Sequence, residues 1–212
     1  MTSSQDRADD LNDRLGAAIR ALADAVVRTG ATPEQLASAA DAIERVAAEL
    51  AAQPPTRTVH NSPYHALSLV GGSAHPFAPQ LHTVATADGV HGTVVLGPSF
   101  EGGPGLVHGG VLSLLFDHAM GQAIFHAGHA AMTVSLEITY RAPTPLLVPL
   151  AVDARVERTE GRKLFVSARV SAEGRLTAEA TGVFVALTAA NVAQIFPADR
   201  IPGGSPDQLR QR

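Results

Sequence analysis

One carboxylate stands out because of the residues around it. Asp117 lies in the middle of a run from Val111 to Ala127 in which most of the remaining positions are apolar. Burying an unpaired charge is costly, so a carboxylate on an apolar helix normally has hydrogen-bond partners or a chemical role. The alternative is a structural Asp, held by local hydrogen bonds on the one polar stripe of the helix.

The residues before this run could bind a developing negative charge. Small or polar residues recur every four positions and form one line along a helix: Gly109, Ser113, Asp117 and Gly121. At the head of that line, His108-Gly109-Gly110 leaves the amides of the first helical turn without bulky cover. Free N–H groups at the positive end of the helix dipole form an anion or oxyanion site. A carboxylate and an oxyanion site are the two parts that an acyl-transfer hydrolase requires.

The periodicity on either side of the helix predicts the elements that position it. Two short strands flank a turn at Asp88-Gly89, and four more strand-like segments follow the helix, at 131–141, 148–158, 163–172 and 175–188. The connections are too short for crossover helices, which argues against a parallel sheet. We therefore expect an α+β fold in which an antiparallel sheet wraps around one central helix that is buried on all sides.

A different pattern occupies the N-terminal quarter of the chain. Residues 1–52 are rich in Ala, with apolar residues at helical spacing, and Thr32, Pro33 and Gln35 form a helix start with a capping box. The sequence thus predicts a helical hairpin over 1–52, a linker or lead-in over 53–73, a globular domain over 74–190 and a tail over 191–212.

The composition narrows the functional classes. The chain has 212 residues, with 20 acidic and 16 basic side chains, no Cys and no Trp. The whole acidic excess lies in residues 1–52, which hold nine acids and five Arg, so the remainder is neutral and poorly suited to nucleic acid. Without Cys, disulfides and thiolate metal sites are excluded. With no signal-peptide pattern and no apolar run long enough for a bilayer, we expect a cytoplasmic protein that contacts no membrane.

The segment from Gly97 to Asp117 resembles the hotdog-fold acyl-CoA thioesterases of the phenylacetate-pathway (PaaI-like) group. It reads Gly-Pro-Ser-Phe-Glu-Gly-Gly-Pro-Gly-Leu-Val-His-Gly-Gly-Val-Leu-Ser-Leu-Leu-Phe-Asp. The resemblance continues through the Thr-x-x-Leu-x-Ile-x-Tyr pattern to about Leu187, and residues 1–52 lie outside it. It implies hydrolysis of an acyl-CoA thioester with no cofactor, coenzyme A being part of the substrate.

The resemblance also implies roles by position. Asp117 matches the catalytic carboxylate, as general base or as nucleophile, and Gly109 matches the N–H that polarises the thioester carbonyl, with Gly110 beside it. Thr133 matches the residue that orients water, and His108 matches the motif histidine, for which a structural role in the loop is also open. Several relatives carry Asn or Gln where this chain has Gly102.

Helix geometry predicts how these parts meet. Gly109 and Asp117 are eight residues apart, about 12 Å along one helix, too far for one thioester carbon to contact both. Two such helices, antiparallel about a two-fold axis, would bring each Gly109 opposite the Asp117 of the other chain. We therefore expect a homodimer with shared active sites, in line with hotdog proteins, and pairing of dimers into tetramers.

Other residues are weaker candidates for a functional site. The histidines at 118, 126 and 129 lack a metal-binding pattern, Ser113 is not in a nucleophile elbow, and Gly102–Gly105 is no phosphate loop. Arg141, Arg162 and Lys163, the only Lys, could hold the phosphates of coenzyme A or be ordinary surface residues. Two alternatives to the thioesterase stay open: a hotdog hydratase or dehydratase that uses His108, and a non-catalytic acyl-CoA-binding protein.

Overall fold

The fold consists of an N-terminal helical hairpin followed by a sheet and helix domain. The computed structural model describes residues 4–54 and 68–188. In chain order the elements are α1 (Ser4–Val26), α2 (Pro33–Ala51), β1 (His82–Thr86), β2 (Gly89–Val95), the short 3-10 helix η1 (Pro98–Phe100), α3 (Gly109–His126), β3 (Ala131–Tyr140), β4 (Pro149–Glu160), β5 (Lys163–Ala172) and β6 (Arg175–Ala186). No described helix is both long and apolar enough to span a bilayer.

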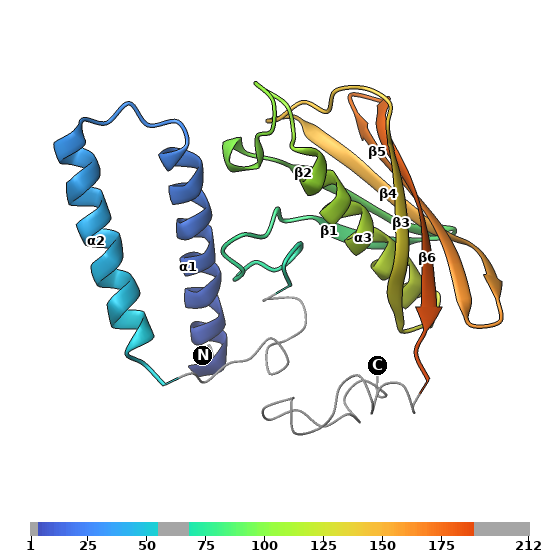
Figure 1. The fold of residues 1–212 in the computed structure, drawn as a ribbon. Helices are drawn as coiled ribbons and strands as arrows, with labels where there is room; N and C mark the ends of the chain where they lie inside the picture. The colour runs from blue at the N-terminus through green and yellow to red at the C-terminus, as the bar shows by residue number, and fades with distance from the viewer. Residues whose placement is uncertain (1–3, 55–67, 189–212) are drawn as a thin grey trace.

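The six strands form one antiparallel sheet in the order β1-β2-β4-β5-β6-β3. The helix α3 packs across one face of this sheet, as Figure 1 shows. The predicted α+β class is thus confirmed, and every predicted strand after the helix is found within two residues of its expected ends. The strand β3 follows α3 directly in the chain and forms one edge of the sheet.

The core lies between α3 and the sheet. The buried side of the helix is Leu112, Leu115, Phe116, Ala119, Met120, Ala123 and Ile124, and it faces buried strand residues such as Leu150, Val152 and Leu164. The prediction that α3 is buried on all sides is wrong for one stripe: Asp117 and Phe125 are exposed, and Ser113 and Gly121 are partly so. A single sheet covers one side of a helix, so this stripe beside the β3 edge is left open.

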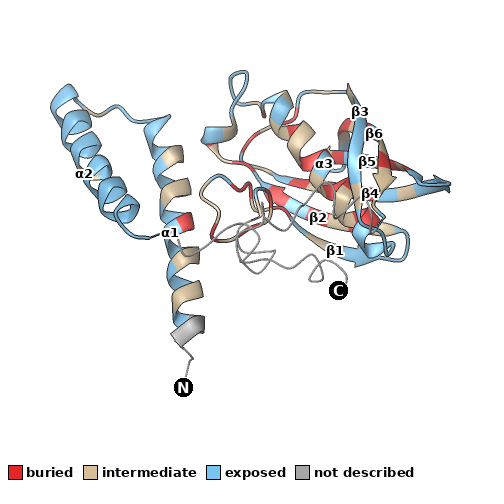
Figure 2. Cartoon of the chain, turned by 60° about the horizontal axis from the view of Figure 1, so that its bottom comes forward, coloured by how far each residue is buried: buried red, intermediate tan, exposed pale blue. Residues whose placement is uncertain are grey.

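The N-terminal hairpin has the predicted helix start. The Thr32 hydroxyl accepts a hydrogen bond from the Gln35 N–H, and the Gln35 side chain accepts one from the Thr32 N–H, so the capping box is confirmed. In both views α2 lies on the side of α1 away from the sheet, and none of its residues is buried (Figure 2). The predicted linker falls partly, and the predicted tail from 191 wholly, outside the described residues.

Candidate active site

The glycine-rich segment before α3 forms a tight hairpin that ends at His108. Glu101 pairs with Val107, and the His108 N–H donates to the Phe100 carbonyl at 2.9 Å. A Cβ at Gly102 would lie 2.7 Å from the His108 Cα, so the hairpin has no room for a side chain there. This close approach gives a physical reason for glycine at 102, where the resemblance expects Asn or Gln.

His108 is the N-cap of α3. Its Nδ1 accepts a hydrogen bond from the Gly110 N–H at 3.0 Å, which satisfies one of the free donors of the first turn. The Gly110 N–H is therefore already occupied and is not free for a substrate oxygen. The Gly109 N–H, by contrast, donates to no acceptor within the described part of the chain.

Tyr140 and Ser113 fix the position of Gly109. Both hydroxyls donate to the Gly109 carbonyl, each at 3.1 Å. A Cβ at position 109 would lie 3.1 Å from the Tyr140 hydroxyl, so a larger residue would require that ring to shift by a few tenths of an ångström. The contacts hold the peptide on the C-terminal side of Gly109 in place, beside the N–H that the sequence assigns to the oxyanion.

Asp117 lies two turns further along the open stripe of α3. The Thr133 hydroxyl donates to its Oδ1 at 2.7 Å, and both side chains are exposed in the single chain. In the single chain, α3 turns this carboxylate away from the core. One oxygen is held by Thr133, and the other is open to solvent or to a partner.

A β-bulge in β3 is what turns Thr133 toward the helix. Thr133 pairs with Phe184 and Ser135 with Val183, so Val134 is an extra residue in the strand. Regular alternation back from Leu136, which packs against the core, would turn Val134 inward and Thr133 outward. The extra residue reverses this, and Thr133 lies opposite the buried Phe184 on the core face.

The strand β3 thus supports both ends of the site. It runs back along α3, so its start contacts Asp117 through Thr133 and its end contacts Gly109 through Tyr140. Asp117 and Gly109 lie on the same open stripe of the helix, eight residues apart. Sequence reasoning missed the role of Tyr140, although it closes the Thr-x-x-Leu-x-Ile-x-Tyr pattern.

The three basic residues predicted for phosphate binding lie at two ends of the sheet. Arg141 lies beside Gly109 and pairs with Glu179, its Nε donating to Oε1 at 2.9 Å. Arg162 and Lys163 lie at the opposite end, where the Arg162 side chain donates to the Ala186 carbonyl. By strand register, Lys163 is two strands away from Met132, near the Asp117 end of the site.

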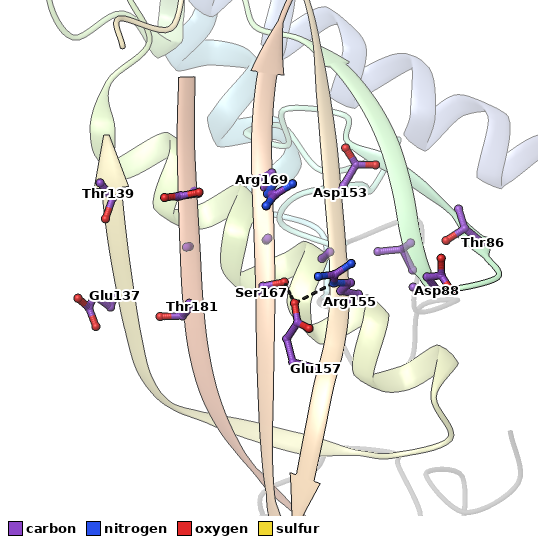
Figure 3. A pocket seen from close by; sticks show the side chains of 16 residues that line it. Thr86, Asp88, Glu137, Thr139, Asp153, Arg155, Glu157, Ser167, Arg169 and Thr181 are labelled. Atoms are coloured by element: carbon purple, nitrogen blue, oxygen red, sulfur yellow. Dashed lines mark hydrogen bonds and ion pairs between the residues drawn. The ribbon is translucent and has the colours of Figure 1, made fainter. Parts of the chain in front are cut away.

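Two hollows differ in their relation to this site. A pocket of about 480 Å³ adjoins the start of α3 and is lined by Gly109, Leu112, Tyr140 and the 141–144 turn. A larger hollow, of about 600 Å³, lies on the face of the sheet that does not carry α3 (Figure 3). There Glu157 accepts hydrogen bonds from Ser167 and Arg155, and the bond from Ser167, followed by that from Arg155, lowers its pKa. The larger hollow contains none of the predicted site residues.

No group of three His, Cys, Asp or Glu side chains within the described ranges is arranged to hold a metal ion. The three histidines near the end of α3 thus form no such cluster. The chemistry that the site offers is that of a carboxylate and a backbone N–H.

Comparison with known proteins identifies the family. The model of the thioesterase superfamily matches residues 104–179. A crystal structure of a thioesterase superfamily protein superimposes with a TM-score of 0.76 and 31% identity, over 82% of this chain and 90% of that one. The chain belongs to the thioesterase superfamily. Its sheet wrapped around α3 is the hotdog fold of that superfamily.

Curated members of the superfamily match over a shorter region. Acyl-coenzyme A thioesterase THEM4 of Bos taurus is 40% identical over 93 residues, and THEM4 of Mus musculus is 41% identical over the same length. These stretches cover 43% of this chain and 38% and 40% of the relatives, so the match spans about two fifths of their length. The segment of this thioesterase superfamily chain that matches the family model contains His108, Gly109, Asp117, Thr133 and Tyr140. It contains neither α1 nor α2.

Proposed function

We propose that this chain is an acyl-CoA thioesterase, which hydrolyses an acyl-CoA thioester to a free acid and coenzyme A. The observation that carries the proposal is the Asp117 carboxylate, held by Thr133 on the same open stripe as the Gly109 N–H. The names of the cow and mouse relatives, both acyl-coenzyme A thioesterases, agree with it.

The proposed reaction uses Asp117 as a general base. Its free carboxylate oxygen takes a proton from water as that water attacks the thioester carbonyl carbon. The Gly109 N–H, at the positive end of the α3 dipole, stabilises the negative charge that develops on the carbonyl oxygen. The C–S bond then breaks, and the sulfur of coenzyme A receives the proton held by Asp117. Direct attack by Asp117 on the carbonyl carbon is the competing route, and single turnover in ¹⁸O-labelled water separates the two. A base puts the label into the released acid, whereas a nucleophile puts it first into the Asp117 carboxylate.

The site is proposed to be shared between two subunits. The eight-residue spacing of Gly109 and Asp117, about 12 Å, prevents one thioester from meeting both in a single chain. The edge strand β3 pairs on its outer side with no other strand of the described residues and exposes Met132 and Val134, which suits pairing with the β3 of a second copy. Such pairing lies beside the open stripe of α3 and would desolvate Asp117.

Arg162 and Lys163 are proposed to contact a phosphate of coenzyme A, because they lie at the Asp117 end of the sheet. Arg141 is proposed for the same role at the Gly109 end, although its guanidinium already pairs with Glu179. For a phosphate contact, we expect Lys163→Ala to raise KM for acyl-CoA and to leave kcat nearly unchanged.

A panel of acyl-CoA substrates read with a thiol reagent tests the function, and the chain adds no background because it has no Cys. Release of thiol by the wild type, lost in Asp117→Asn, supports the thioesterase. Tight binding without thiol release would instead indicate an acyl-CoA-binding protein. Turnover of crotonyl-CoA without thiol release would indicate a hydratase.

A further inference from the structure

The helix α1 docks onto its own domain through its polar face. The Asp13 carboxylate accepts a hydrogen bond from the Ser73 hydroxyl at 2.7 Å, and Arg20 donates to the carbonyls of Ser73 and His75. Gly16 between them is buried, and a Cβ there would lie 2.7 Å from the Ala74 backbone. One turn on, Asp24 accepts from the Ser99 N–H at 2.9 Å. Polar and small side chains thus make the intramolecular contact.

The apolar face of α1 points the opposite way. Leu11, Leu15, Leu22 and Val26 have exposed fractions of 38% to 56%. With Ala18 they lie on the side of the helix opposite the docked residues, at spacings of three and four. A surface helix normally buries its apolar stripe against its own core and presents polar residues to water. In α1 this arrangement is reversed.

The helix α2 also presents an apolar stripe that residues 4–54 and 68–188 leave largely uncovered. Leu36, Ala39, Ile43, Val46 and Leu50 alternate at spacings of three and four, as the seam of a helical bundle does. Their large side chains are 42% to 52% exposed, and α1 and α2 barely contact each other. A helix of 19 residues with no buried residue is marginal in water, so packing against another element is needed to stabilise it.

We propose that the leucine-rich stripes of α1 and α2 are the interface for the same hairpin of a second copy, so that two hairpins form a four-helix bundle. The eight large side chains expose on the order of 700 Å² per chain, and pairing two copies would bury roughly 1,400 Å², as much as a stable protein–protein interface needs. A two-fold pairing covers the stripes of both helices in both copies at once.

The charges of the hairpin are placed so that they permit this pairing. On α1, the charged residues Asp13, Arg20 and Asp24 face its own domain. On α2, the positions that flank the seam are mostly Ala, at 40, 42 and 47, so two helices can approach closely. The acidic excess therefore lies away from the seam. The contact is independent of the proposed hydrolysis.

Engineered thiols test the contact directly, because the chain has no Cys of its own. We expect full-length Ile43→Cys, alone or mixed with Leu15→Cys, to form disulfide-linked pairs of chains under mild oxidation. Phe77→Cys is the control, because Phe77 is 67% exposed but lies outside the hairpin. Linking no faster than in that control would overturn the proposal. So would an intramolecular disulfide as the main product of the Leu15→Cys/Ile43→Cys double variant, since the hairpin would then close on itself.

Self-association gives a second readout. Ile43→Glu combined with Val46→Glu should weaken association through the hairpin at least tenfold by sedimentation, because it places charges in the seam, whereas pairing through β3 should persist. Val84→Glu, at a more exposed apolar residue on β1, should not weaken association through the hairpin. Circular dichroism checks that both variants fold. A folded Ile43→Glu/Val46→Glu chain that associates like the wild type would overturn the proposal.

Discussion

At the scale of single residues, the proposed reaction depends on one carboxylate that a neighbouring hydroxyl holds in place. Thr133 donates to Oδ1 of Asp117 and leaves the other oxygen for water. We expect Asp117→Asn to lower the rate of thioester hydrolysis about 100- to 10,000-fold, because it keeps the shape of the side chain but removes the base. Thr133→Ala should cost less, since the carboxylate remains and only its orientation is lost.

Steady-state kinetics with an acyl-CoA substrate checks both variants, and binding of a non-hydrolysable analogue shows whether the pocket is intact. Asp41→Asn is a matched control, because Asp41 is an exposed Asp on a helix far along the chain from the site. Turnover by Asp117→Asn close to that of the Asp41 variant would refute the role of Asp117.

We expect Tyr140 to act on the proposed reaction through the peptide that follows Gly109. Its hydroxyl donates to the Gly109 carbonyl, together with that of Ser113. We expect Tyr140→Phe to lower kcat about three- to tenfold, the loss typical of one hydrogen bond, with little change in KM. In the double variant with Ser113→Ala the loss should exceed the product of the two single losses, because either hydroxyl alone can hold the carbonyl. A rise in KM with an unchanged kcat would contradict this assignment.

At the scale of elements, the glycine hairpin before α3 is positioned by close packing. A side chain at Gly102 would meet the His108 Cα at 2.7 Å. We expect Gly102→Asn to lower the free energy of unfolding by about 1–3 kcal/mol, as overpacking does, and to reduce activity by displacing the N-cap of α3. Thermal unfolding measures the first effect and kinetics the second.

The neighbouring Gly103 provides the control, since the nearest atom to a Cβ there is 3.9 Å away. Gly103→Asn should be nearly neutral. Equal stability of the two variants would show that the close approach at 102 is relieved without cost.

The contact between α1 and the sheet domain should depend on pH through His75. Burial, together with the charge of Arg20, lowers the pKa of His75 below its ordinary value of 6.5. Between the lowered pKa and pH 6.5, the unfolded chain binds more protons at His75 than the folded chain does. The contribution of neutral His75 to the free energy of unfolding is therefore complete above pH 6.5 and is lost as the pH falls through the lowered pKa. The melting temperature should therefore drop between about pH 7.5 and about pH 5.5.

In His75→Asn that drop should be smaller. In the wild type the Phe77 N–H donates a hydrogen bond to His75 Nδ1. The Asn side chain keeps an acceptor for this hydrogen bond, but it does not titrate. An unchanged pH dependence in this variant would assign the effect to other groups.

The elements were largely predictable from the sequence because their periods are strong and local. The capping box at Thr32 and the strands after the helix follow from short-range pattern alone. The exposed stripe of α3 could not be predicted in the same way, since mean hydropathy does not tell which side a single sheet covers. The Asp24–Ser99 contact joins residues 75 positions apart and left no pattern in either segment. The position of Thr133 came from resemblance, because regular alternation would have placed it on the wrong face.

At the scale of the whole molecule, the proposed sharing of the site would make the two subunits complementary. A mixed dimer of Asp117→Asn and Gly109→Pro chains would combine the intact Gly109 of one chain with the intact Asp117 of the other at one of its two sites. We expect an equal mixture of these two inactive variants to regain about a quarter of wild-type activity after exchange of subunits.

The activity of each variant measured alone is the baseline. A mixture of either variant with an equal amount of denatured chain controls for the total protein concentration. Dilution should abolish the regained activity as dimers dissociate. No recovery from a mixture shown to contain mixed dimers would place both residues of a working site in one chain.

The extra residue in β3 has a consequence for how this protein tolerates change. Val134 is the extra residue, and its side chain is exposed on the edge strand. Replacing it should therefore matter little to the single chain. Deleting it would restore regular alternation and would leave Thr133 opposite Phe184 on the core face, because the residue before Ser135 faces inward in a regular strand. The bulge thus lets this chain carry one more residue in β3 while Thr133 still faces Asp117, and a relative that is one residue shorter at this point could keep the same pair on a regular strand.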